Sequence, residues 1–324
     1  MRSHPTILLI GLFAGGCAAE SVNRPPPPPV DWQSLQVQPV PDAGNLRATE
    51  KERAVAELYT KAIASPGFAQ LGSMLAEDAH FLFGDKDTRG RERVVKAHDE
   101  LFGSFDERIF VNSRIFRTDR SQALEWVMSG IAPAHKPVTI KGLTLLWTND
   151  DGSISDVHVY FDQKVAKELQ KFPPPPVPSG PPQVFEQQGT PEEAANIALI
   201  RAMLQALEDN KESAYLSTLA NDVEVFTLDR AQPVHGKDAL ERLFRSLRRS
   251  IGDLDTVVHN GWGFQQFAVV EYSIAGLQIA PFGRIPFVPN RLFSTRLVDI
   301  AEIRGGKITR IWRYDDSGAL EPSK

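Results

Sequence analysis

Three side chains able to do acid–base chemistry lie at every second position of the segment SDVHVYFD, residues 155–162: His158, Tyr160 and Asp162. Alternate residues of a β-strand point to the same face, so these three would share one face of a strand. Each strand residue rises about 3.3 Å, which puts His158 and Asp162 roughly 13 Å apart at Cα and excludes a direct hydrogen-bonded dyad. One ligand could still touch all three. The segment is therefore either the reactive face of an enzyme or the end of a sheet.

Other candidate groups lie earlier in the chain. His98 falls on the apolar stripe of a predicted helix, where a satisfied core residue is the commoner interpretation. Glu125 lies in a predicted strand and would have a raised pKa in an apolar pocket, although exposure or pairing with an arginine is favoured. His80, His98 and His158 with Asp78 could suggest zinc, but their long spacings match no compact ligand motif, so no metal site is expected. No phosphate loop, G-x-S-x-G or H-E-x-x-H motif occurs, and no cofactor is predicted.

Two proline-rich segments divide the chain: RPPPPPVDW at 24–32 and FPPPPVPSGPP at 172–182. Proline fixes φ and lacks an N–H, so both segments are predicted to be extended spacers. The halves that flank the second segment share landmarks in the same order. These are LAEDAHF (75–81) with LANDVEV (219–225), EWVMSG (125–130) with EYSIAG (271–276), and DGSISDVHVYFD (151–162) with GGKITRIWRYDD (305–316). The order predicts an internal duplication of a domain-sized unit.

Each half begins with an amphipathic helix pattern and ends with consecutive alternating strands, which predicts α+β domains with antiparallel sheets. Both halves resemble the SnoaL-like branch of the NTF2-like superfamily. The resemblance rests on LAEDAHFLF with Gly90, EWVMSG and DGSISDVHVYFD, and on LANDVEVFTL with Gly236, EYSIAG and GGKITRIWRYDD. It implies two tandem cones, each a curved sheet wrapped around helices with a pocket. The family includes isomerases, cyclases, dehydratases and epoxide hydrolases beside non-catalytic binding domains, and these motifs specify no reaction.

The second copy bears on which face of the last strand lines the cone. It carries Trp312 and Tyr314 on one face and Arg313 and Asp315 on the other. The aromatic face reads as the buried one, and homologous strands keep their register. His158 and Tyr160 are therefore predicted to point into the cone.

This assignment determines which residues are predicted to line the pocket and which are predicted to lie on the outer face of the sheet. The predicted ligand-binding residues are His80, His98, Glu125, His158, Tyr160, Trp312 and Tyr314. Val157, Val159 and Phe161 would lie on the outer sheet face and need cover from the other domain or another chain. The first half is expected to hold a polar pocket, and the second an apolar or filled one.

The first twenty residues, MRSHPTILLIGLFAGGCAAE, predict export. Their apolar run is far shorter than the roughly 20 residues of a membrane-spanning helix and is typical of a secretory signal. Residues 14–17 resemble a bacterial lipobox, which implies cleavage before Cys17 and a lipid on its sulfur. Cys17 is the only cysteine and has no intramolecular disulfide partner, which favours lipidation. Ala18, rather than aspartate, implies sorting to the outer membrane.

The predicted organisation is a signal peptide (1–16), a lipidated tether (17–46), two domains (47–170 and 190–318), a linker (171–189) and a tail (319–324). A net charge of −5 gives no basic excess for nucleic acid.

Three hypotheses remain. A lipoprotein that binds a small apolar ligand or a protein partner without catalysis is the first. The second is an enzyme that transfers protons with His98, His158, Tyr160 and Asp162. The third is a structural role as an intramolecular pseudo-dimer or homodimer at the cell envelope. The first and third are favoured because no tight acid–base pair is visible.

Overall fold

The computed structural model of the chain describes residues 50–84, 86–133, 135–162, 174–228, 230, 232–281 and 288–315. The predicted signal peptide, Cys17 and the tether lie outside these ranges. Among the described residues, no helix has the length and apolar character needed to cross a membrane.

The first domain places short helices before and between the strands of one curved sheet. It contains α1 (Glu50–Ala64), a 3-10 turn (Pro66–Phe68), α2 (Leu71–Met74), β1 (Leu75–Phe83), β2 (Lys86–Arg89), α3 (Arg91–Phe102), β3 (Asp106–Arg117), β4 (Ser121–Ala132), β5 (Lys136–Thr148) and β6 (Ile154–Phe161). Strands β3 to β6 pair antiparallel in sequence order, and β1 joins β6 in parallel.

The second domain repeats this plan, which confirms the predicted tandem architecture. It contains α5 (Pro191–Glu208), α6 (Glu212–Ser217), β8 (Leu219–Phe226), β9 (Val234–His235), α7 (Lys237–Ser250), β10 (Ile251–Phe264), β11 (Phe267–Gln278), β12 (Arg291–Arg304) and β13 (Lys307–Tyr314). Its strand order, β10-β11-β12-β13-β8-β9, repeats the order β3-β4-β5-β6-β1-β2 of the first sheet. Strand β13 joins β8 in parallel, as β6 joins β1.

Local sequence accounts for the helix starts. Gly90 and Gly236 precede α3 and α7 with φ of 99° and 84°, a conformation that residues with a Cβ rarely adopt. Helix α5 begins with a capping box in which Thr190 and Glu193 satisfy each other's backbone N–H groups.

The segment between the domains adds one strand to the first sheet. Strand β7 (Gln183–Glu186) follows the last proline of the linker and pairs in parallel with β3 at the sheet edge. Its residues keep the N–H groups that the proline run lacks, so the linker supplies a strand where the sequence predicts only a spacer.

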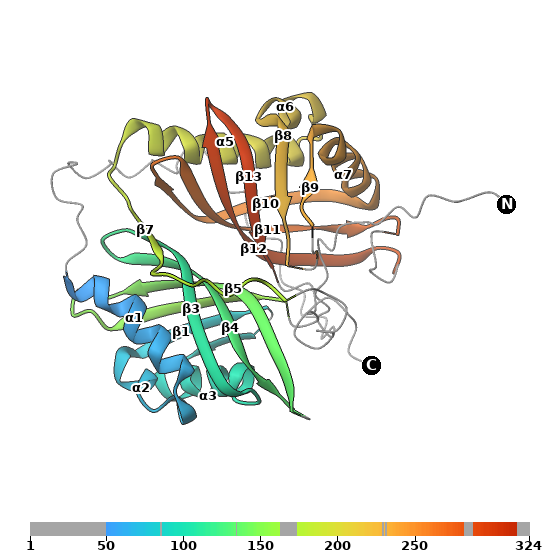
Figure 1. Cartoon of the computed structure of the whole chain (residues 1–324). Helices are drawn as coiled ribbons and strands as arrows, with labels where there is room; N and C mark the ends of the chain where they lie inside the picture. Colours follow the sequence, from blue (N-terminus) through green and yellow to red (C-terminus); the bar gives the residue numbers. More distant parts are fainter. Residues whose placement is uncertain are drawn as a thin grey trace.

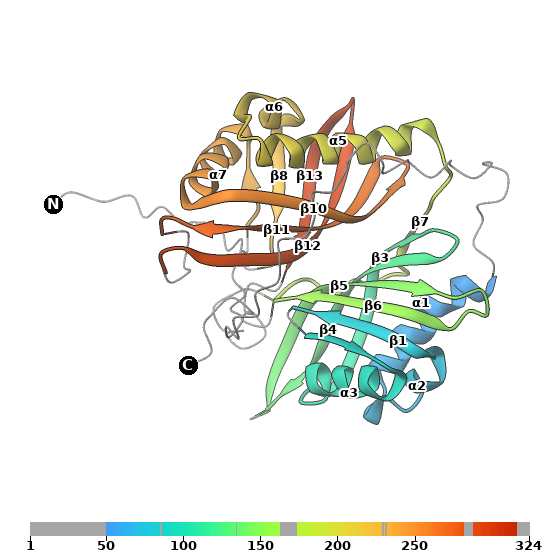
Figure 2. The ribbon, with the colours of Figure 1, turned by 180° about the vertical axis from the view of Figure 1, so that it is seen from behind.

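The two sheets pack face to face, with the helices on the far sides (Figures 1 and 2). Each domain has its own core between sheet and helices, and a third cluster lies between the sheets. This interface cluster contains Phe116, Ala123, Leu143, Leu145 and Tyr160 from the first domain and Phe264, Phe267, Val269, Val298, Ile300 and Tyr314 from the second. Both faces of each sheet are therefore buried over much of their area.

The predicted cone-facing side of the last strand is wrong. Val157, Val159 and Phe161 pack into the core between the first sheet and its helices. His158 and Tyr160 lie on the opposite face, towards the second domain, and Trp312 and Tyr314 lie likewise on the interface side of β13. The error has a physical cause: the neighbouring domain covers the outer face, so large aromatic residues do not distinguish the two faces.

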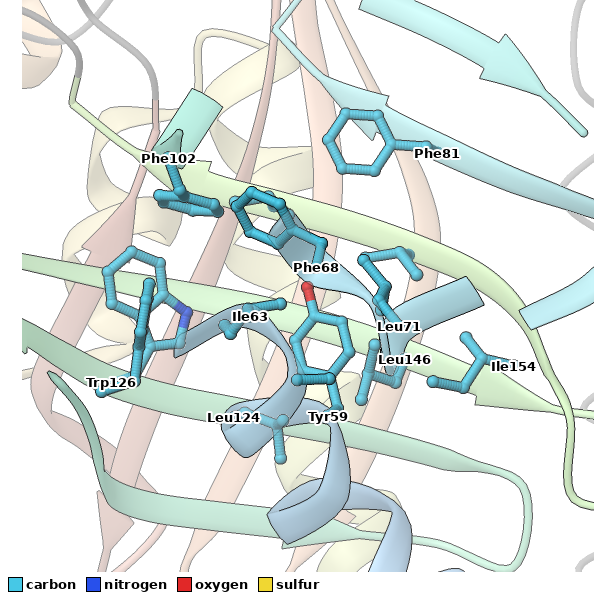
Figure 3. Close-up of a cluster of buried hydrophobic side chains, with 14 of the residues drawn as sticks. Tyr59, Ile63, Phe68, Leu71, Phe81, Phe102, Leu124, Trp126, Leu146 and Ile154 are labelled. Atoms are coloured by element: carbon cyan, nitrogen blue, oxygen red, sulfur yellow. The ribbon is translucent and has the colours of Figure 1, made fainter. Parts of the chain in front are cut away.

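The space inside the first cone is occupied by side chains. Figure 3 shows the rings of Tyr59, Phe68, Phe81, Phe102 and Trp126 converging between the helices and the sheet. All five are almost completely buried. The polar pocket expected in this domain is therefore absent from the described part of the cone, where aromatic residues fill the space.

Candidate functional site

His98 is the one predicted histidine that lies inside the first cone. It is completely buried on α3, contacts Tyr59 Oη through Nε2 at 2.9 Å, and its Nδ1 lies 2.8 Å from the carbonyl oxygen of Val94. Burial lowers its pKa to about 4, against a smaller opposing effect of the Val94 hydrogen bond. The favoured sequence interpretation, a satisfied core histidine, matches this geometry.

The remaining predicted residues gather at the domain interface around two equivalent carboxylates. Tyr314 of the second domain donates a hydrogen bond to Glu125 of the first. Tyr160 of the first domain donates to Glu271, the equivalent of Glu125 in the second, at 2.5 Å. The two tyrosines are themselves equivalent, so the domains exchange the same contact in both directions. Burial, followed by the partner carboxylate, raises the pKa of each tyrosine well above its ordinary value, and both remain donors.

Glu125 is neutralised by cations of its own domain. Arg114 binds it through Nε and through Nη2 at 2.9 Å, and Lys141 Nζ lies 2.7 Å from Oε1. Burial alone would raise the pKa of Glu125, but Lys141 and Arg114 lower it far below its usual range. The alternative of an arginine-paired strand carboxylate is therefore confirmed, and Glu125 has none of the raised pKa that a general acid needs.

Glu271 has different partners, because two equivalent positions differ. Asn260 stands where Arg114 stands in the first domain and donates a hydrogen bond to Glu271. His158 stands where Trp312 stands in the second, and its Nδ1 lies 2.7 Å from Oε1 of Glu271. Burial would raise the pKa of Glu271, but His158, Arg296 and Tyr160 lower it to about 2. An ionised carboxylate is thus held by an imidazole from the other domain.

His80 lies beside His158, with ring centroids 5.7 Å apart. Its Nδ1 is 3.1 Å from Asp156 Oδ1 and its Nε2 is 2.9 Å from Asp87 Oδ1. The structure therefore brings two of the three predicted histidines together and leaves His98 on the other side of the sheet. Asp162 directly follows β6 and is 1% exposed.

A cavity is present in the second cone, where an apolar or filled pocket is expected. Its volume is about 40 Å³. The lining is Met203, Leu204, Leu207, Tyr215, Val225, Leu240, Leu243, Phe244, Leu247, Tyr272, Ile274, Ile311 and Arg313. An apolar wall with few polar groups is typical of small-molecule sites.

The polar residues of the lining are Arg313, Tyr272 and Tyr215, and Arg313 is paired with Asp299, which is not itself part of the lining. Arg313 binds Asp299 through Nε at 2.7 Å and Nη2 at 2.6 Å, and Nη2 also donates to Tyr272 Oη at 3.0 Å. Tyr272 donates to Asp299 Oδ2 at 2.8 Å. Burial raises the pKa of Tyr272 well above its ordinary value, so this residue remains a hydroxyl. Burial alone would lower the pKa of Arg313, but Asp299 and Tyr272 raise it, so the cation persists.

Substitutions between the two copies explain why this cone has free space. Val225 occupies the position of Phe81, and Tyr272 that of Trp126. Each exchange places a smaller side chain in the second domain, and close-packed interiors do not refill such volume completely.

The rim of the cavity is formed by α6 and α7. Tyr215 of α6 and Leu243 of α7 line it and are only half-buried. Arg245 of α7 binds both carboxylate oxygens of Glu212 of α6 at 2.7 Å, so an exposed ion pair joins the two helices at this end of the cone.

Sequence reasoning missed Arg313, Asp299 and Tyr272 as a group. A usable signal existed in the duplication: Arg313 replaces Val159, an apolar residue of the other copy. An arginine in a strand suggests a solvent-facing position, although a paired charge can be buried.

An α+β cone with a helix-covered apolar cavity defines the class of protein. The chain belongs to the SnoaL-like domain family, whose model matches residues 55–157 and 200–311. That family includes cyclases and isomerases.

Solved structures resemble single domains of the chain. A SnoaL-like protein from Jannaschia sp. has 17% identity and a TM-score of 0.37, covering 42% of this chain and 97% of that one. TsrD from Streptomyces laurentii has 21% identity and a TM-score of 0.35, covering 39% and 92%. An NTF2-like protein from Burkholderia xenovorans has 19% identity and a TM-score of 0.32, covering 40% and 94%. A comparison with curated proteins gives no match.

Proposed function

We propose that the protein is an envelope lipoprotein whose second domain binds a small, neutral, mainly apolar molecule without catalysis. The observation that carries the proposal is the cavity closed by Arg313, Asp299 and Tyr272. Its wall offers only van der Waals and hydrophobic contact, which selects apolar ligands.

The polar end supports recognition of one oxygen atom. The hydrogen bonds of Arg313 to Asp299 and Tyr272 use Nε and Nη2, so Nη1 is the nitrogen that we assign to a ligand oxygen. Asp299 neutralises the guanidinium, which favours a hydroxyl or carbonyl oxygen over a second carboxylate. An aliphatic alcohol or ketone has this chemistry.

The size of the cavity limits the ligand. A cavity of roughly 150 Å³ holds benzene, whereas this one measures about 40 Å³. Ligands longer than a few atoms would have to displace Tyr215 and Leu243 at the rim.

The enzymatic alternative required His98, His158 and Tyr160 in one open pocket. His98 lies within the first cone, and His158 and Tyr160 lie on the other face of the sheet, bound to Glu271. Proton transfer by this set on a common substrate is therefore not part of the proposal. We infer that these interface residues instead hold the two domains as an intramolecular pseudo-dimer.

The test is calorimetric titration with a series of 1-alkanols. Burial of each methylene contributes about 0.8 kcal/mol, so the affinity should rise about fourfold per added carbon until the chain outgrows the cavity. Affinity that does not depend on chain length, or no saturable binding by any member, would exclude the proposed site.

A further inference from the structure

We propose that His80, Asp156 and His158 form a binding site for a divalent transition-metal cation of the zinc type. Each residue offers one ligand atom, and these atoms lie within 4.8 Å of one another. The site lies on the neighbouring strands β1 and β6 of the first sheet, beside the domain interface, and the proposal does not depend on the ligand proposed for the second cone.

Strand pairing places the three side chains on one face. His80 of β1 lies opposite Asp156 of β6 in the parallel pair, and His158 follows two residues later. Alternate strand residues share a face, so a long sequence separation becomes a compact set of two imidazoles and one carboxylate. Spacing along the chain does not show this proximity, because the three residues meet only through the pairing of β1 with β6.

His158 is already oriented as metal-binding histidines are. Its Nδ1 lies 2.7 Å from the buried carboxylate of Glu271, which leaves Nε2 as the coordinating atom. A carboxylate on the second ring nitrogen fixes the tautomer and strengthens the ligand. Glu271 is itself held by Asn260 and Tyr160.

The contacts of His80 support a cation between its Nδ1 and the carboxylate of Asp156. Its Nδ1 and Nε2 each face a carboxylate, that of Asp156 at 3.1 Å and that of Asp87 at 2.9 Å. A neutral imidazole has one N–H and can donate to only one of these carboxylates. Either a second proton or a metal ion beside Nδ1 and Asp156 satisfies the other contact, and the metal ion is the alternative that also uses His158. Neighbouring ligands of a zinc ion with bonds of about 2.0–2.1 Å lie roughly 3.3 Å apart in a tetrahedral site, close to the observed separation.

The second domain shows the same positions without a ligand set. Glu224 and Arg310 occupy the places of His80 and Asp156 and form an ion pair at 3.0 Å, and Trp312 replaces His158. The simpler interpretation of the first domain is an ion pair between His80 and Asp156, with the charges reversed relative to Glu224 and Arg310. The additional imidazole of His158 separates the two cases.

The donor set suits zinc and related ions, because imidazole nitrogen with one carboxylate is a common environment for them. Three protein ligands leave one coordination position open. The side chain of Asp156 is 37% exposed, which gives an ion access from solvent.

The test is calorimetric titration of the chelator-treated full chain with zinc chloride. We expect one saturable site per chain, with affinity lowered at least tenfold in His80→Ala and in Asp156→Asn. Glu271→Gln should weaken binding by about 10- to 100-fold, the usual effect of losing a carboxylate behind a ligand histidine. His235→Ala removes an exposed histidine elsewhere and serves as the matched control, with unchanged affinity.

Thermal unfolding with and without zinc gives a second measurement. Zinc should raise the melting temperature of the wild type and of His235→Ala but not of Asp156→Asn, whose exposed position makes loss of the fold an inadequate explanation. Absence of saturable zinc binding in the wild type would overturn the proposal and leave the His80–Asp156 contact as an ion pair. Equal binding by the wild type and Asp156→Asn would also overturn it.

Discussion

Replacement of His98 by phenylalanine, the residue at the equivalent position 244, should remove a large pH dependence from the stability of the first domain. Burial lowers the pKa of His98 from 6.5 to about 4. As the pH falls below 6.5, His98 therefore binds a proton in the unfolded chain but remains neutral in the folded chain until the pH nears 4. The stability that His98 contributes as a neutral group is present above that pH and is lost towards pH 4. Linkage gives a loss of about 2 kcal/mol at pH 5 and about 3 kcal/mol at pH 4.

The assay is urea unfolding of the wild type and His98→Phe at several pH values between 7.5 and 4, followed by circular dichroism and tryptophan fluorescence. The variant leaves Tyr59 without its 2.9 Å partner, which costs about 1–3 kcal/mol at every pH and does not affect the slope. The difference in unfolding free energy between the two proteins should therefore change by about 3 kcal/mol across the range. His235→Ala should follow the wild type. A constant difference between wild type and His98→Phe would refute the buried, neutral state of His98.

Three further predictions concern the interface, the cavity and the anchor. Tyr160→Phe and Tyr314→Phe should each lower the unfolding free energy by about 1.5–3 kcal/mol in urea titrations, because each removes a hydrogen bond to a buried carboxylate. An unchanged unfolding free energy in either variant would contradict the reciprocal contact. Arg313→Leu should lower the unfolding free energy by about 3–5 kcal/mol, since it leaves Asp299 buried without its cation. Arg310→Leu should cost at most about 1 kcal/mol, because Arg310 is 45% exposed, its partner Glu224 is 29% exposed, and the buried Glu302, which it also contacts, keeps Arg304. Equal losses would disagree with a buried pair in the cone. Cys17→Ser should abolish metabolic labelling by radioactive palmitate, and persistent labelling would remove the proposed anchor.

The duplication and the fold class were predictable because they depend on local signals. The order of landmarks in the two halves and the positions of Gly90 and Gly236 reflect strand pairing and helix starts, which each domain repeats. The register of the last strand was also predictable, since Val157 and Ile311 both face their cones. The choice of face was not, because the decisive contacts come from the other domain.

The interface contacts illustrate this limit. Glu125 and Tyr314 are separated by 189 positions and meet only when the sheets pack. No periodicity within either strand predicts that contact. Arg313 illustrates a second limit: its charge predicts solvent, whereas its partner Asp299 lies on a different strand and makes burial possible.

The most direct test of the proposed binding function is titration of 1-alkanols into Val225→Phe, which gives the second cone the ring that Phe81 supplies in the first. Val225 lines the cavity, and the larger side chain should fill it. The account predicts that this variant loses the rise in affinity with chain length, while Phe81→Val, the reciprocal change in the other domain, retains the wild-type alkanol site. Alkanol affinities in Val225→Phe equal to those of the wild type would contradict the assignment of the ligand site to the second cone.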